Sequence, residues 1–273
     1  MNARNETIYI LGHSASEIQR LQTQAEILRP ITERLLLNAG IRPGMRVLDI
    51  GCAAGDVAML AGEMVGPSGA VIGIDRNSEV LATARDRAQA SGLSHIKFEM
   101  ASPETLIDDD LFDLVIGRYV LIHQSDPVSL LRTAARLARP GGSVAFHEIR
   151  LSQKSESVPN VPLFELIEKL IRMAFSSALS NYDVGDRLVQ CFSDAGLPQP
   201  KLFCETPIWA GADVPCSWLM DTLRSLLPQL HRIGIALKDV MVIETLESQL
   251  RDAIVAAHSQ VSGPPQICAW TRL

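Results

Sequence analysis

The stretch VLDIGCAAGDVA, from Val47 to Ala58, constrains the fold of this chain more than any other feature. It begins as an apolar segment typical of a buried strand, passes through a turn of glycine and alanine, and restarts as a helix near Asp56. The free N–H groups at the start of such a helix attract anionic groups. A strand, turn and helix of this kind therefore predict an α/β protein whose turn binds a nucleotide-like ligand.

Strands and helices alternate on both sides of this unit. We expect parallel strands in the segments 46–50, 70–75, 95–100, 113–118 and 143–149, with helices of 10–15 residues between most of them. This alternation indicates βαβ units, and ligands of such sheets bind at the carboxyl ends of the strands, where the strand order reverses. The expected fold class is a doubly wound, Rossmann-like α/β fold with a mostly parallel seven-stranded sheet.

Two helical regions flank the alternating core of residues 41–150. Residues 1–40 predict an N-terminal helical cover, with a capping box at Ser14 and two helices that separate at Pro30. Residues 151–273 predict an inserted helical lid together with the last strands of the sheet. The expected elements of this region are helices near 162–180, 184–195, 215–230 and 239–258, and strands at 201–207 and 264–273.

Composition excludes several classes of function. The 273 residues carry a net charge of −6 and no cluster of five or six basic residues, so we expect no nucleic-acid partner. No window approaches the ~18 apolar residues of a membrane span, and the apolar run near the N-terminus is too short for a signal peptide. The five cysteines lack C-x-x-C spacing, which favours reduced thiols and no metal site. We expect a cytoplasmic protein.

The spacing of the small residues separates two kinds of nucleotide site. A dinucleotide fingerprint needs glycine at its first, third and sixth positions, but the chain counted from Gly51 has Ala53 and Asp56 at the last two. NAD and FAD therefore fit poorly, and the Gly-Lys-Ser/Thr ending of a phosphate-binding loop is absent. The turn instead places Asp49 two residues before Gly51, with further small residues at 53 and 55.

This arrangement resembles motif I of the class I S-adenosylmethionine-dependent methyltransferases, (D/E)-x-G-x-G-x-G. Ala53 replaces the middle glycine, and we expect it to be tolerated with a negative φ. Asp75 ends the next strand, where the family has an acid that binds both ribose hydroxyls. The segment MASPETL is similar to GDAEDLP of the ubiquinone/menaquinone-type enzymes, with Ala101 and Ser102 in place of the Gly-Asp pair whose acid binds the adenine amino group.

The resemblance covers residues 41–150 and includes FDLVIGRYVLIHQSDP and LARPGGSVAFHE. It implies that this region is a core that binds S-adenosylmethionine. The sequence shows no clustered set of metal ligands, so we expect no metal. The cofactor-binding residues that it implies are Asp49, Gly51, Cys52, Ala53, Gly55, Asp75, Arg76, Ala101, Ser102 and Arg118. In this class a segment before the core commonly folds over the cofactor, which makes Tyr9 and Gln24 candidates for contact with it.

The implied reaction is methyl transfer to a small organic molecule. Proximity and alignment supply much of the acceleration of an in-line displacement, whereas a hydroxyl acceptor also needs a general base. His123 follows the fourth strand at the ligand edge and is the candidate base, although it could equally be a packed wall histidine. His147 and Glu148 point to opposite sides of the fifth strand, so at most one faces the substrate. Tyr119 is a candidate for the pocket wall.

The lid is rich in apolar residues, including Phe175, Trp209 and Trp218. We therefore expect a hydrophobic or aromatic acceptor that is methylated on oxygen, nitrogen or carbon. The resemblance to the family, and not the composition, implies a secondary-metabolite or quinone-like acceptor. The competing interpretation is a methyltransferase-fold protein that binds the cofactor in a structural role or for a rearrangement. Residues 117–120 lack the N-P-P-Y type motif of enzymes that methylate nucleic-acid amines. The long helix near 239–258 could also form a homodimer.

Overall fold

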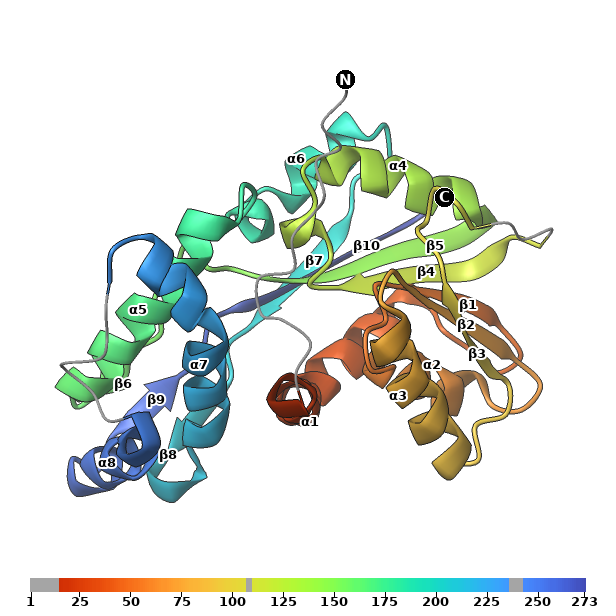
Figure 1. Cartoon of the computed structure of the whole chain (residues 1–273). Helices are drawn as coiled ribbons and strands as arrows, with labels where there is room; N and C mark the ends of the chain where they lie inside the picture. The colour runs from red at the N-terminus through yellow and green to blue at the C-terminus, as the bar shows by residue number, and fades with distance from the viewer. Residues whose placement is uncertain (1–14, 107–109, 236–242) are drawn as a thin grey trace.

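The computed structural model describes residues 15–106, 110–235 and 243–273. Its main sheet has the strand order β3-β2-β1-β4-β5-β10-β7, and every neighbouring pair is parallel except the two pairs made by β10 (Figure 1). The strand order reverses between β1 and β4, which marks the carboxyl ends of these strands as the ligand position. The strands are β1 (Arg46–Ile50), β2 (Ala70–Asp75), β3 (Ile96–Met100), β4 (Phe112–Arg118), β5 (Ala138–Ile149), β7 (Lys201–Glu205) and β10 (Gln266–Arg272). The predicted doubly wound, seven-stranded fold is therefore confirmed.

Helices cover both faces of the sheet because successive strand residues point to opposite sides. Val47 packs in a core with α1 (Ala15–Ala39), α2 (Asp56–Val65) and α3 (Ser78–Ala90). The next residue, Leu48, packs on the opposite face with α4 (Pro127–Leu137) and α6 (Leu188–Asp194). The predicted start of α4 is confirmed, since the Asp126 carboxylate accepts a hydrogen bond from the N–H of Ser129.

The N-terminal region differs from the sequence prediction. A single helix, α1, runs through Pro30 instead of two helices that separate there. Proline removes one helical hydrogen bond, but Pro30 lies on the exposed side while Leu28, Ile31 and Leu35 are buried against the sheet. Burial of this apolar face offsets the defect. The predicted capping box at Ser14 and the candidate contact residue Tyr9 lie outside the described residues.

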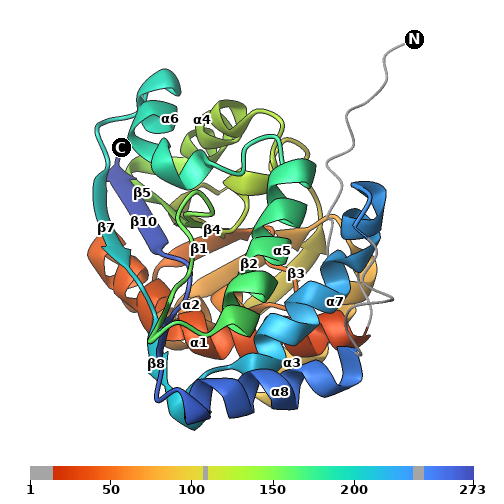
Figure 2. The same ribbon diagram turned by 90° about the vertical axis from the view of Figure 1, so that its left-hand side faces the viewer.

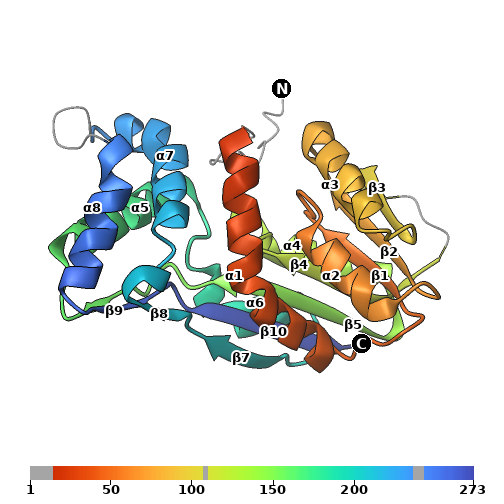
Figure 3. The same ribbon diagram turned by 90° about the horizontal axis from the view of Figure 1, so that it is seen from below.

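A third core lies beside the sheet. It is built by α5 (Pro162–Ala178), α7 (Cys216–Arg232) and α8 (Ile243–Ala256), which we call the outer helices. They form the left-hand group in Figure 1 and the front layer in Figure 2. Figure 3 shows α1 between this group and α2, in agreement with the contacts that α1 makes with α7 and α2. None of the described helices is long and apolar enough to cross a membrane.

A small antiparallel sheet under the outer helices was not predicted. It has the order β6-β9-β8, with β6 (Ser157–Val158), β8 (Ile208–Ala210) and β9 (Gln260–Ser262). The helix predicted near 184–195 is divided into a 3₁₀ turn, η2 (Val184–Asp186), and α6. Strands of two or three residues are too short to show a period in the sequence, so only the folded chain reveals this sheet.

Candidate functional site

A cavity of about 760 Å³ opens at the carboxyl ends of β1, β2 and β4, between the sheet and the helices α1, α5 and α7. This volume lies within the range of small-molecule sites. Nearly all of the residues proposed from the sequence line it. They are Asp49, Gly51, Cys52, Ala53, Asp75, Arg76, Ala101, Ser102, Arg118 and His123. Gly55 is the exception, because it does not line the cavity.

The turn between β1 and α2 adopts a left-handed backbone at three positions. Gly51, Ala53 and Gly55 have φ values of 66°, 45° and 84°. The expectation of a negative φ at Ala53 was therefore wrong. The backbone of Ala53 adopts a left-handed conformation that residues with a Cβ disfavour. Gly55 has a packing role, since a Cβ there would lie 2.8 Å from the ring of Phe98. The third glycine of the motif thus allows the start of α2 to pack closely against β3 and α3.

Asp75 fixes the unusual conformation of this turn. Its Oδ2 accepts a hydrogen bond from the N–H of Ala53 at 3.1 Å, and its Oδ1 accepts one from the N–H of Asn77 at 2.9 Å. The end of β2 is thereby joined to the turn after β1. A carboxylate has about four acceptor positions, so Asp75 keeps lone pairs for a ligand in the cavity.

Asp49 is the most strongly perturbed acid of the cavity. It is 1% exposed, and burial raises the pKa of its carboxyl group to about 8, against the opposing charge of Arg118. Its Oδ2 has no hydrogen-bond partner among the described residues. The side chain of Arg118 approaches the hydroxyl of Thr32 on α1 at 3.4 Å. A buried acid with an unsatisfied oxygen suits a ligand that brings a positive charge.

His123 lies on a 3₁₀ turn, η1 (Leu121–His123), at the wall of the cavity. Burial and the charge of Arg20 lower the pKa of its imidazole to about 4, so the ring is neutral at pH 7. Glu148 holds this turn, because its Oε1 accepts hydrogen bonds from the N–H groups of Val120 at 3.0 Å and Leu121 at 2.8 Å. Glu148 therefore positions the segment that carries His123.

His147 points to the other side of β5 and takes part in a buried network. Its ring nitrogens contact Thr32 Oγ1 at 3.0 Å and Gln266 Oε1 at 3.1 Å. The hydroxyl of Tyr119 donates to the same Gln266 oxygen at 2.5 Å. Neither His147 nor Glu148 lines the cavity, whereas Tyr119 does, as the sequence suggested. The network joins α1, β5 and β10 to Tyr119, the residue that follows β4.

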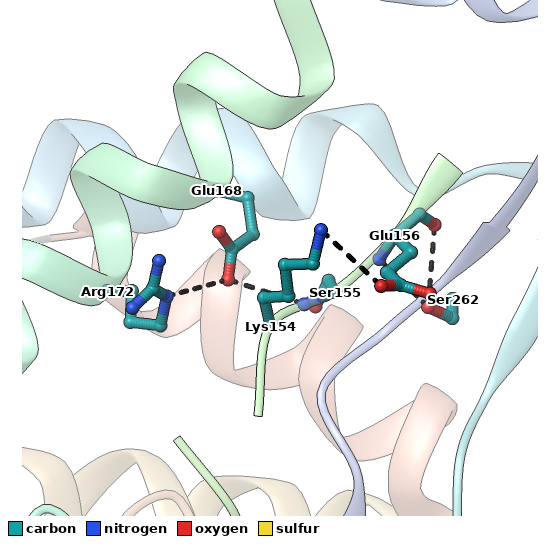
Figure 4. Close-up of polar contacts among 6 residues, drawn as sticks. All are labelled: Lys154, Ser155, Glu156, Glu168, Arg172 and Ser262. Carbon is teal, nitrogen blue, oxygen red and sulfur yellow. Dashed lines mark hydrogen bonds and ion pairs between the residues drawn. The ribbon is translucent and has the colours of Figure 1, made fainter. Parts of the chain in front are cut away.

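The helices α5 and α7, with the residue after α5, provide the remaining wall of the cavity. Its apolar part consists of Phe164, Ile171, Phe175, Leu179, Trp218 and Leu219, whereas Trp209 lies elsewhere. A polar rim adjoins it, where Glu168 Oε1 accepts hydrogen bonds from the Ser155 N–H at 3.3 Å and from Arg172 Nε at 3.2 Å (Figure 4). Gln24, a candidate for contact with the cofactor, also lines the cavity. Sequence reasoning missed Arg20, Glu168 and Arg172, which no motif marks.

Comparison with known proteins agrees with this geometry. A family model described as a methyltransferase domain matches residues 41–183, just over half of the chain. An uncharacterized 37.1 kDa transposon protein of Streptomyces fradiae is 32% identical over 173 residues, which cover 63% of this chain and 48% of that protein. A ubiquinone/menaquinone biosynthesis C-methyltransferase of Vibrio vulnificus is 36% identical over 106 residues, covering 38% and 41%. The chain thus spans about half the length of these relatives or less.

Solved structures of similar length also match this chain. A candidate methyltransferase of Bacillus halodurans superposes with a TM-score of 0.55 at 17% identity, covering 88% of this chain and 97% of that one. The fold and the family model define a doubly wound methyltransferase domain. The chain belongs to the methyltransferase domain family of class I S-adenosylmethionine-dependent enzymes. The cofactor of this family is S-adenosylmethionine. Within the described residues, no three His, Cys, Asp or Glu side chains are grouped as metal ligands.

Proposed function

We propose that the protein transfers the methyl group of S-adenosylmethionine to a small hydrophobic or aromatic acceptor. One observation carries this proposal: a single cavity extends from the turn after β1 and from Asp75 to an apolar wall on α5 and α7. The first part suits the cofactor and the second part suits an apolar acceptor. Both molecules would share one cavity, as an in-line displacement requires.

The polar groups of the inner part fit the cofactor. Asp49 offers an unsatisfied carboxyl oxygen to its cationic end, and Asp75 retains acceptor positions for ribose hydroxyls. Gly51 leaves the backbone open to close approach, because it carries no Cβ. When bound, the cofactor supplies a methyl group already activated by its sulfonium. The chain then has to align the acceptor and exclude water.

His123 is our proposed base for a hydroxyl acceptor. Its imidazole lies on the cavity wall and is neutral at pH 7, so the unprotonated form that a general base requires is present. Replacement of His123 by Ala is expected to lower kcat by about 10²-fold or more with a hydroxyl substrate, and to leave the affinity for S-adenosylmethionine within about twofold. Full turnover of the variant with such a substrate would remove His123 as the base.

Calorimetric titration with S-adenosylmethionine, S-adenosylhomocysteine, NAD and NADP tests the cofactor assignment. We expect micromolar binding of the two adenosyl ligands and none of the dinucleotides. Binding of NAD alone, or of none of the four, would contradict the proposed cofactor site. Aromatic acceptors are then screened by mass spectrometry for the gain of one methyl group.

The competing function is cofactor binding without methylation. The departures at Ala53 and Ser102 favour it, and the hydroxyl of Ser102 already contacts Thr105 Oγ1 at 3.2 Å. In that case the calorimetric result would be the same, but S-adenosylhomocysteine would not accumulate with any acceptor that binds. Its release together with a methylated product would exclude this function.

A further inference from the structure

The indole group of Trp218 is an unexplained polar feature of the cavity. Trp218 lies on α7, lines the cavity and is 8% exposed. Within the described part of the chain, its Nε1–H has no hydrogen-bond partner. Buried indole N–H groups usually have one, because an unsatisfied donor costs about 1–3 kcal/mol. A molecule that enters the cavity would be the natural source of the missing acceptor.

Two polar side chains of α5 and α7 that line the cavity already make hydrogen bonds within the protein. Thr222, one turn further along α7, donates its hydroxyl to the carbonyl oxygen of Trp218 at 2.8 Å. On α5, Glu168 accepts hydrogen bonds from Ser155 and Arg172, as Figure 4 shows. The acid at this end of the cavity is thus paired with a base of its own helix, and it offers little attraction to a cationic ligand.

A second donor lines the same cavity. Arg20 on α1 is 2% exposed, lines the cavity and donates to Gln24 Oε1 at 2.8 Å. It lies close enough to His123 for its charge to act on the imidazole. An indole and a guanidinium donate hydrogen bonds but cannot accept them. Their complement in a ligand is an oxygen atom with free lone pairs.

We propose that Trp218 donates its indole N–H to an oxygen atom of the methyl acceptor, so that the site selects oxygen-bearing aromatic compounds. This inference rests on the proposed function and adds to it the chemical class of the acceptor. The ring of such a compound would lie among Phe164, Ile171 and Phe175, which line the same cavity. The positive charge of Arg20 would favour the ionised form of an acidic hydroxyl.

Two probes of nearly equal shape test this assignment. The protein, labelled with ¹⁵N and saturated with S-adenosylhomocysteine, is titrated with 2-naphthol and with 2-methylnaphthalene. Its three tryptophans give three indole N–H signals, and Trp218→Phe identifies one of them. We expect 2-naphthol alone to move the Trp218 proton downfield. We expect Trp218→Phe to weaken 2-naphthol binding by about three- to tenfold and to leave 2-methylnaphthalene binding unchanged.

Trp209→Phe is the matched control, because Trp209 lies on β8 and does not line the cavity. It should change neither affinity. The proposal is overturned if Trp218→Phe weakens both probes equally, or if 2-naphthol leaves the Trp218 signal in place. If S-adenosylhomocysteine binds but neither probe does, both this proposal and the proposed aromatic acceptor are overturned. If S-adenosylhomocysteine itself does not bind, the proposed cofactor site is contradicted. If Trp218→Phe does not fold, Trp209→Phe and Trp270→Phe identify the third signal by difference.

Discussion

At the scale of single residues, Ala53 is a point of strain in the turn after β1. Its φ of 45° costs an L-residue about 1–2 kcal/mol. Glycine would remove this cost, but it loses about 0.5–1 kcal/mol more conformational entropy than alanine on folding. Ala53→Gly should therefore raise the free energy of unfolding by up to about 1 kcal/mol, measured by urea denaturation. Ala54→Gly is the control: Ala54 is buried without a positive φ, so this change should destabilise. Equal destabilisation by both changes would contradict strain at Ala53.

The carboxylate of Asp75 carries the second prediction at this scale. Asp75→Ala removes the acceptor of two backbone N–H groups and the proposed ribose contact. The affinity for S-adenosylmethionine should fall at least tenfold, which is about 1.4 kcal/mol, as measured by calorimetry. Asp86→Ala, on the exposed side of α3, should leave the affinity unchanged. An unaltered affinity in Asp75→Ala would exclude this residue from the cofactor site.

The sequence predicted which residues line the inner cavity but not how they act. Motif spacing located Asp49 and Asp75, because both residues lie at the carboxyl ends of predicted strands. The sign of φ at Ala53 depends on its hydrogen bond to Asp75, and the role of Gly55 depends on the ring of Phe98. Arg20 has no motif around it. Such contacts join residues far apart in the chain, and local patterns do not contain them.

At the scale of elements, the η1 turn depends on a single buried side chain. Glu148→Ala would leave the N–H groups of Val120 and Leu121 without their acceptor and should lower the free energy of unfolding by about 2 kcal/mol or more. Glu148→Gln keeps a carbonyl oxygen in place and should lose clearly less. Urea denaturation of the two variants at pH 6.5 measures the difference. Equal losses would show that Glu148 does not act as an acceptor for this turn.

Elements with a regular period were predictable, and those set by tertiary packing were not. The apolar strands and the helices between them predicted a parallel sheet with helices on both faces, because each βαβ unit has a right-handed connection. The continuity of α1 through Pro30 depends on the apolar face that it buries. The strands β6, β8 and β9 pair segments about 50 to 100 residues apart, which no local pattern reveals.

At the scale of the whole molecule, four buried titratable groups give the stability a definite pH dependence. Burial raises the pKa of Asp49 and of Glu148 to about 8, from ordinary values of 3.8 and 4.5. The folded state then binds more protons than the unfolded state, so stability falls as pH rises toward 8. Burial lowers the pKa of His123 to about 4 and of His147 to about 3. Below pH 6.5 the unfolded state binds more protons at these two histidines, so their contribution to stability decreases as pH falls.

The two effects oppose each other below pH 6.5, but only the carboxyl groups act between pH 6.5 and 8. The free energy of unfolding should therefore decrease across this window, by about 2 kcal/mol for each carboxyl group. Urea denaturation at several pH values measures the slope, and Glu148→Gln should reduce it by about half, whereas Asp86→Asn at the surface should not. Burial also raises the pKa of the Cys52 thiol above 9.0, which places its effect beyond the window. A flat profile from pH 6.5 to 8 would mean that both carboxyl groups are ionised in the folded protein. Asp49 would then meet the cofactor already charged instead of losing a proton on binding.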